Sequence, residues 1–363
     1  MQGKGILGND ILPVDVVFHP SWWNRAAGLT FDEDFFYHLA KRVESERRME
    51  EVLYERFGDC GLGGNRGRDL PVLGATHLAA GFIVSEMLGC AVAYAEDSPP
   101  QVLPAGLELP SLGVGDITKG AAWKRFEALA EGLKAKHGYL VGDVNWGGIL
   151  NAALDLRGQD LFLDLGDRPE ETRRFFADIA AAIELFTRRV ASLSGTTSIS
   201  VTRNLVNIPA PVFLHSECAL TMLSVEDYEE SLLGFDADFS ASHRPFGIHF
   251  CGKDPHRFAP SFAKLPHLDF LDVGWGGDVA AIRRLLPGTF LNLRLDAAHI
   301  ASTGEAEIHD TIERLVGESG NPWLTGVCCI NMDDKVADEK VRTIFRTVSG
   351  LRERYLVDQG ESA

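Results

Sequence analysis

The sequence has too few cysteines for a disulfide-stapled protein and too few basic residues for a nucleic-acid-binding one. Its 363 residues include six cysteines, scattered between Cys60 and Cys329, whereas disulfide scaffolds are short and rich in cysteine. The 35 Lys and Arg residues face 52 Asp and Glu residues, which gives a formal net charge of −17. Because phosphate groups require a surplus of basic residues, this balance argues against nucleic acid and anionic membrane surfaces as partners.

Long hydrophobic runs and internal repeats are also missing. No run of about 18 apolar residues could form a transmembrane helix, and the first residues lack the apolar core of a signal peptide. We therefore expect a cytoplasmic protein. No self-similar segments of about 20–50 residues are visible, which excludes solenoids and propellers. The chain does have 45% hydrophobic residues, enough for an ordinary globular core.

The chain divides near residue 135 into a mixed part and a regular part that we assign to one structural domain. Residues 1–135 are expected to form helices over 31–57 and 73–87, short strands between 91 and 112, and the first elements of the main fold. Residues 136–363 should form the main part of the fold. A long helix there should begin at Pro169 and run to about Leu193, with Asp167 as its N-cap.

From residue 212 onward, strand and helix patterns alternate five times. Short apolar runs, each followed by a helical pattern, predict strands at 212–215, 246–251, 268–273, 290–295 and 324–330. Such alternation indicates a parallel sheet with strands buried on both faces. A doubly wound sheet and a closed barrel both fit this pattern.

Polar residues near the ends of several predicted strands favour the barrel. They are Asp143, Asn145, His215, Glu217, His249, Cys251, Asp272, Asp296 and Cys328. In an open sheet only the switch point gathers such residues, whereas all strand ends of a TIM (β/α)8 barrel meet at one mouth. We therefore predict an α/β fold, a TIM barrel with an N-terminal helical and hairpin extension.

The sharpest chemical signal is His249 and Cys251 together with Cys328. A His and a Cys two residues apart on a strand point to the same side, and Cys328 is expected to end a later strand. One imidazole and two thiolates suit Zn²⁺, and three protein ligands leave a fourth position open, as in catalytic sites. The alternative is a core histidine with two buried thiols. Cys329 should point away from Cys328 into the core, unless a bulge exchanges them.

Glu217 and Asp272 are candidate catalytic residues of the same site. Glu217 follows His215 by two residues at a strand end, and either side chain could bind zinc or orient a substrate. Alternatively, Glu217 is a carboxylate placed at a helix start by the helix dipole. Asp272 could fix the tautomer of His249, or it could cap the next turn.

Asp143 and Asn145 are candidates for cofactor or substrate binding. They precede Trp146 and a pair of glycines, which would allow a ligand to approach the backbone closely. A turn with an Asx cap explains the same residues equally well.

The motif His249-Phe-Cys-Gly-Lys, with Cys328 placed 77 positions after Cys251, resembles the uroporphyrinogen decarboxylase-like superfamily. Within it, the resemblance is to the zinc-containing, cobalamin-linked methyltransferases of the methylcobamide:coenzyme M type. Further similar segments are Pro71-Val-Leu-Gly, residues 93–100, 156–158, 167–171 and 222–228.

The resemblance implies a TIM barrel that binds zinc through His249, Cys251 and Cys328. It implies transfer of a methyl group between a corrinoid, supplied by a corrinoid protein or as substrate, and a thiol acceptor. Alternatives are a methoxylated or quaternary-amine donor, a tetrahydrofolate acceptor, a decarboxylase, and a non-catalytic barrel that binds a corrinoid carrier. A monomer and a homodimer are both compatible with the sequence.

One segment departs from authentic uroporphyrinogen decarboxylases. Those enzymes bind substrate carboxylates through an Arg-rich N-terminal motif, which the segment from Phe18 to Arg25, Phe-His-Pro-Ser-Trp-Trp-Asn-Arg, does not match. The thiol-rich motif also has no role in that decarboxylation. Both features argue against porphyrinogen decarboxylation.

Overall fold

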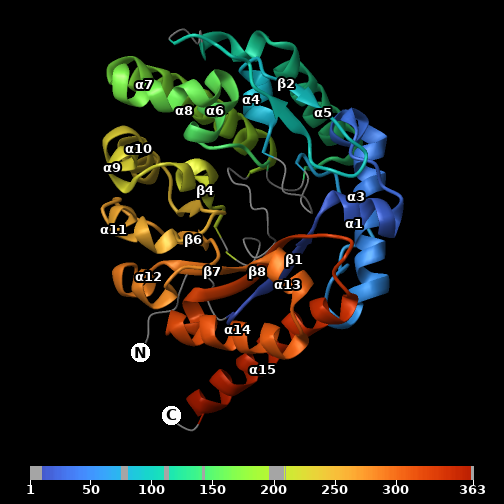
Figure 1. Ribbon diagram of the computed structural model, residues 1–363. Helices are drawn as coiled ribbons and strands as arrows, with labels where there is room; N and C mark the ends of the chain where they lie inside the picture. The colour runs from blue at the N-terminus through green and yellow to red at the C-terminus, as the bar shows by residue number, and fades with distance from the viewer. Residues whose placement is uncertain are drawn as a thin grey trace.

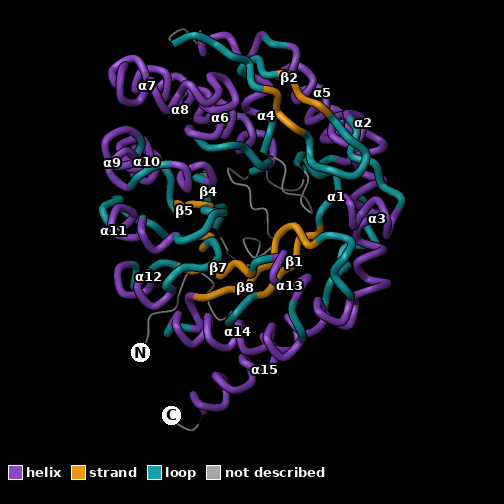
Figure 2. The backbone as a smooth tube through the Cα atoms, in the orientation of Figure 1, coloured by secondary structure: helices purple, strands orange, loops and turns teal. Residues whose placement is uncertain are grey.

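The computed structural model describes residues 10–74, 81–109, 114–140, 144–195, 208 and 210–360. Six parallel strands form one curved sheet in the order β1-β8-β7-β6-β5-β4 (Figures 1 and 2). The strands are β1 (Val14–Phe18), β4 (Phe213–Ser216), β5 (Phe246–His249), β6 (Phe270–Val273), β7 (Phe290–Leu295) and β8 (Thr325–Met332). A separate antiparallel hairpin joins β2 (Ala91–Ala93) and β3 (Gln101–Leu103).

Helices of the C-terminal half cover the outer side of the sheet (Figure 1). They are α9 (Val225–Ser231), α10 (Leu233–Ser242), α11 (Ala259–Phe262), α12 (Val279–Leu285), α13 (Ala297–Ser302), α14 (Glu305–Ser319) and α15 (Asp338–Gly360). The N-terminal half supplies α1 (Pro20–Ala27), α2 (Glu33–Tyr37), α3 (Leu39–Phe57), α4 (Ile83–Met87), α5 (Ala121–His137), α6 (Ile149–Arg157), α7 (Leu161–Asp167) and α8 (Pro169–Ser194). In the described ranges, no helix is both long enough and apolar enough to cross a membrane.

The five predicted strand–helix units are all present, and the predicted parallel pairing is confirmed. Their sheet curves as a barrel wall does, with β1 added beside β8. The described residues contribute six strands to this sheet, so the eight strands of a complete barrel are not all among them.

Three local predictions were wrong in detail. The helix expected over 31–57 is two helices, because His38 is extended and its side chain caps the N-terminus of α3. Of the helix expected over 73–87, the described part is only α4, and residues 75–80 lie outside the described ranges. Asp167 is not the N-cap of α8, since it is the last residue of α7 and Arg168 takes the cap position.

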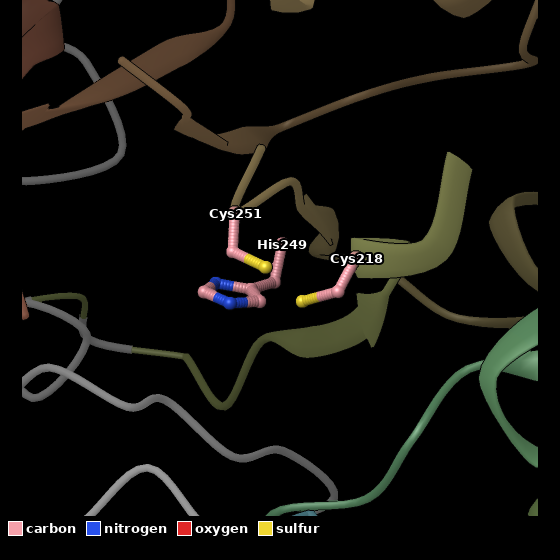
Figure 3. Close-up of side chains that lie close together, drawn as sticks. All are labelled: Cys218, His249 and Cys251. Carbon is pink, nitrogen blue, oxygen red and sulfur yellow. The ribbon is translucent and has the colours of Figure 1, made fainter. Parts of the chain in front are cut away.

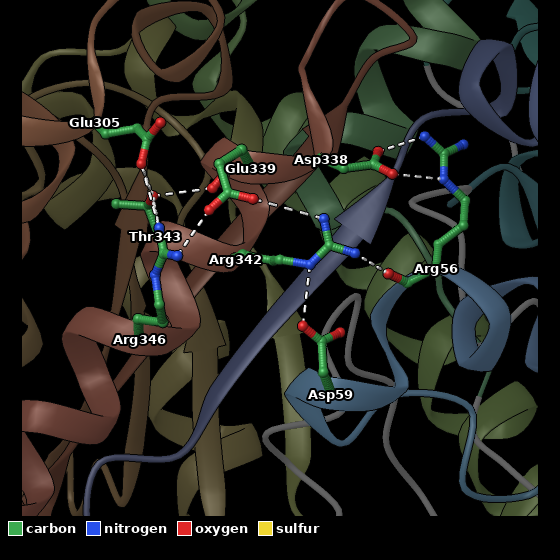
Figure 4. Close-up of polar contacts among 8 residues, drawn as sticks. All are labelled: Arg56, Asp59, Glu305, Asp338, Glu339, Arg342, Thr343 and Arg346. Carbon is green, nitrogen blue, oxygen red and sulfur yellow. Dashed lines mark hydrogen bonds and ion pairs between the residues drawn. The ribbon is translucent and has the colours of Figure 1, made fainter.

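Polar contacts attach the last helix to the N-terminal helices (Figure 4). Arg56 at the end of α3 donates from Nε to Asp338 Oδ2 at 3.0 Å, and Arg342 donates from Nε to Asp59 Oδ2 at 3.0 Å. These side chains are partly exposed, and such ion pairs contribute about 0–1 kcal/mol each. They therefore fix the alignment of α15 against α3 more than they stabilise the fold.

The two faces of the sheet differ in chemistry. Residues that alternate along each strand, such as Leu271 and Leu293, belong to the large apolar core that includes the covering helices. The intervening positions on the inner face include His249, Asp272 and Asn292, which are buried polar residues. Because adjacent residues of a strand point to opposite faces, this alternation concentrates polar groups inside the curve of the sheet.

Candidate metal and catalytic site

Three soft donor groups converge where β4 and β5 end (Figure 3). His249 is the last residue of β5, Cys251 follows it by two residues, and Cys218 begins a short 3-10 helix, η5 (Cys218–Met222), just after β4. One donor atom of each residue lies within 4.8 Å of the other two. Parallel pairing of Ser216 with His249 brings these two strand ends side by side. We call Cys218, His249 and Cys251 the thiol site.

A chain of hydrogen bonds fixes the imidazole of the thiol site. His249 Nδ1 lies 2.6 Å from Asp272 Oδ2, and Asn292 Nδ2 donates to Asp272 Oδ1 at 2.6 Å. Asp272 and Asn292 are fully buried on the neighbouring strands β6 and β7. Holding one ring nitrogen in this way leaves His249 Nε2 available to the two sulfurs, as in metal sites where a carboxylate orients the histidine ligand. Asp272 is not the N-cap of the next helix, since Asp278 caps α12.

Glycines allow the strand ends to approach each other closely. A Cβ atom at Gly252, the residue after Cys251, would lie 1.8 Å from Thr221 Cγ2 in η5. A Cβ atom at Gly148, before α6, would lie 1.6 Å from Ser216 O. Neither distance is possible for a side chain, so glycine at both positions permits the packing around the thiol site.

Hydrogen bonding within the thiol site separates the charges of its three groups. The pKa of Cys251 is lowered to about 4, because Cys218 donates a hydrogen bond to its sulfur and His249 further stabilises the thiolate. Burial lowers the pKa of His249, but hydrogen bonds to Asp272 and Cys251 outweigh burial and raise that pKa to about 9. The pKa of Cys218 is raised well above its ordinary value by its bond to Cys251 and by burial. These shifts favour a thiolate at Cys251 beside a protonated His249.

This charge separation predicts unusual alkylation of the metal-free protein. Iodoacetamide should modify Cys251 at a nearly constant rate between about pH 5.5 and 8, because the thiolate is already formed. Burial raises the pKa of the partly exposed Cys60. Its alkylation rate should therefore increase about tenfold with each pH unit over that range. Peptide mass spectrometry at each pH measures both rates. Parallel pH dependence of the two cysteines would contradict the assignment.

Cys328 is not part of the thiol site. We expected it to end a strand, but β8 continues to Met332, which places Cys328 in the middle of that strand. Its fully buried side chain packs on the inner face with Val17 and Ile330. Cys329 points the other way and belongs to the large core under the helices. The structure thus brings together two of the three predicted ligands, His249 and Cys251, and places Cys218 beside them.

Glu217 and His215 lie in a different group. His215, Glu217 and Asp236 of α10 are all fully buried, with one donor atom of each within 4.8 Å of the others. His215 packs against Phe239 of α10 at a ring distance of 4.9 Å, so it faces the helices and not the inner face. We call His215, Glu217 and Asp236 the carboxylate cluster.

The remaining predicted residues are Asp143, Asn145 and Asp296. Asp143 lies outside the described residues. Asn145 is half-buried and lines a small pocket together with Arg42 and Phe82. Asp296 caps the N-terminus of α13 by accepting from Ala298 N.

Cys218 and Asp236 were missed in the sequence. Cys218 sits three residues beyond His215, just after a predicted strand and beside the strand that carries His249 and Cys251. That placement was the available signal, because neighbouring strand ends share one edge of a parallel sheet. Asp236 offered no signal, since an acidic residue in a helical pattern is ordinarily exposed.

No family model and no curated protein matches the chain. Among solved structures, it is similar to a methyltransferase from Methanosarcina mazei, with a TM-score of 0.68, 13% identity, and 96% of each chain covered. It also aligns with a B12-independent methionine synthase from Shewanella sp. W3-18-1 in complex with selenomethionine, at a TM-score of 0.46 and 10% identity, over 96% of this chain and 100% of that one. At 13% identity, the first likeness shows a shared fold.

Proposed function

We propose that this chain is a zinc-dependent enzyme that transfers a methyl group between a corrinoid and a thiol acceptor. The observation that carries the proposal is the convergence of Cys218, His249 and Cys251 at the carboxyl edge of a curved parallel sheet. Active sites of parallel barrels are built at this edge. The solved methyltransferase with the same fold supports the reaction class.

The donor set fits zinc in chemistry and in spacing. Two sulfurs and one imidazole nitrogen form a common ligand set for zinc. In a tetrahedral site with Zn–S bonds of about 2.3 Å, neighbouring donor atoms lie roughly 3.5–3.8 Å apart. The donor atoms of the thiol site lie within 4.8 Å of one another. Small side-chain rotations that shorten these distances by about 1 Å would close them around an ion. Three ligands would leave one position for substrate.

A bound zinc ion would lower the pKa of a thiol placed in the open position, so that the acceptor reacts as a thiolate near pH 7. Asp272 keeps a proton on His249 Nδ1 and thereby directs Nε2 toward the two sulfurs. The close packing at Gly252 and Gly148 brings these strand ends together. In the transfer, a bond forms between the acceptor sulfur and the methyl carbon while the cobalt–carbon bond breaks, and its electron pair stays on the corrinoid.

We propose that the six-stranded sheet is the continuous part of a (β/α)8 barrel, within a single domain. Beyond β4, Trp146 packs against Phe213 with ring centres 5.4 Å apart, and Trp146 pairs with Phe82 in an isolated β-bridge. The bridge is antiparallel, so these two segments would close the wall beside β4 without continuing its parallel ladder. The open mouth would receive a corrinoid carrier protein as partner of a cytoplasmic enzyme, as a monomer or homodimer.

Methylcobalamin supplies the direct test of this function. Zinc-loaded protein is mixed with methylcobalamin and either 2-mercaptoethanesulfonate or homocysteine, and the cobalt absorption spectrum is followed. We expect demethylation of the corrinoid with one of the thiols and none with metal-free protein. Equal transfer by metal-free protein, or release of carbon dioxide from a carboxylated substrate instead, would overturn the proposal. If methyl transfer occurred with tetrahydrofolate and with neither thiol, the methyl acceptor would be a pterin.

Asp272→Asn should weaken zinc binding without removing a ligand. An amide cannot balance the charge on His249 or enforce its tautomer as a carboxylate does, so we expect zinc affinity to fall about 10–100-fold. Competition with a chromophoric zinc chelator measures the affinity. Asp296→Asn is the matched control, since that strand-end carboxylate caps α13. Equal losses in both variants would assign the effect to folding.

A further inference from the structure

The carboxylate cluster is a second group of ligand-type side chains, and its surroundings separate it from the thiol site. His215, Glu217 and Asp236 have no exposed surface. His215 lies between Phe213 and Phe239, with ring distances of 6.4 and 4.9 Å. The cluster thus lies under α10, in the apolar layer that covers the sheet, whereas Cys218 and Cys251 lie at the strand ends.

Few polar atoms of the cluster have a hydrogen-bond donor or acceptor outside it, apart from Asp236 Oδ2. Both ring nitrogens of His215, both carboxylate oxygens of Glu217 and Oδ1 of Asp236 are buried and unpartnered. Among the described residues, His215 is the one basic group that forms an ion pair with Glu217 or Asp236. Leaving such groups unsatisfied in an apolar layer costs about 1–3 kcal/mol each, and more if charged. One imidazole cannot balance the charge of two ionised carboxylates, so a bound cation would complete the cluster.

The spacing of the donor atoms is that of metal ligands. His215 Nε2 lies 3.1 Å from Glu217 Oε1 and 3.8 Å from Asp236 Oδ1. Two ligands bound at about 2.0–2.2 Å from one ion lie roughly 3.0–3.5 Å apart. The other oxygen of Asp236 accepts from the hydroxyl of Tyr228 at 2.6 Å, which fixes the carboxylate and leaves Oδ1 directed at His215.

We infer that His215, Glu217 and Asp236 form a second metal site, which binds one divalent cation through an imidazole nitrogen and two carboxylate oxygens. The harder ligand set suits Zn²⁺ or Mn²⁺, in contrast to the sulfur-rich thiol site. The ion would tie α10 to the end of β4. Because Glu217 directly precedes Cys218, it would also hold the first residue of the thiol site in place.

A variant without thiol ligands isolates the second site. The full chain with Cys218→Ser and Cys251→Ser is stripped with a chelator and titrated separately with Zn²⁺ and Mn²⁺ by calorimetry, followed by elemental analysis after desalting. We expect one ion per chain to remain bound in this double variant. Adding Asp236→Asn should abolish that binding, whereas adding Asp238→Asn, an exposed carboxylate on the same helix, should leave it unchanged.

No ion bound by the double variant, or binding unchanged by Asp236→Asn, would overturn the second site. Should Asp236→Asn fail to fold, as judged by circular dichroism, Tyr228→Phe replaces it. We expect this loss of a hydrogen bond to Asp236 to weaken metal affinity about 10–100-fold, and unchanged affinity would again overturn the site. These readouts need no methyl transfer, so the outcome is independent of the proposed function.

Discussion

Replacing Cys251 with alanine is expected to abolish zinc binding at the thiol site and methyl transfer together. Cys251 interacts with both other donors, and hydrogen bonds from Cys218 and His249 lower its pKa to about 4. Loss of a carboxylate that hydrogen-bonds to a metal ligand already lowers metal affinity about 10–100-fold. Loss of the ligand itself should therefore lower it by more than about 100-fold. Chelator competition and the methylcobalamin assay measure the two losses in one preparation.

Cys60→Ala is the matched control for this variant. Cys60 lies in a short 3-10 helix after α3 and is outside both groups of metal-ligand type. It should keep the zinc affinity and the rate of the unaltered protein. A Cys251→Ala protein that folds, binds no zinc and still transfers methyl would rule out the zinc-dependent reaction.

Cys218→Ala and Cys328→Ala are expected to differ sharply, which decides the third ligand. Cys218 completes the thiol site, so its loss should lower zinc affinity by more than about 100-fold. Cys328 packs with Val17 and Ile330 in mid-strand, and its loss should cost only about 1 kcal/mol of unfolding free energy. Zinc titration measures the zinc affinity of each variant, and denaturant unfolding measures its free energy of unfolding.

The reverse result would restore the ligand set expected from the sequence. If Cys328→Ala lost zinc and Cys218→Ala kept it, zinc binding would have to draw Cys328 toward His249 and Cys251. Loss of zinc in both variants would indicate four protein ligands and no open position, which would remove the substrate position from the proposed mechanism.

The strands could be predicted because their signal is local. The runs at Phe246–His249 and Phe290–Leu295 are apolar and short, and a polar or glycine-containing turn ends each. Helix boundaries were less predictable where a residue within a helical pattern acts as a helix cap. His38 interrupts a continuous helical pattern by capping α3, and Arg168 replaces Asp167 as the cap of α8 because α7 continues up to that point.

The sequence by itself determined the alternation of strands and helices. It also determined the nearness of His249 to Cys251, because only one residue separates them, although β5 ends at His249 and Cys251 follows the strand. Only the tertiary structure decided which thiol joins them. Cys218 and Cys328 are both far from Cys251 along the chain, and their positions depend on strand length and pairing: β4 ends before Cys218, while β8 extends past Cys328. The carboxylate cluster likewise exists only because α10 packs on β4, a contact between distant residues that no local pattern specifies.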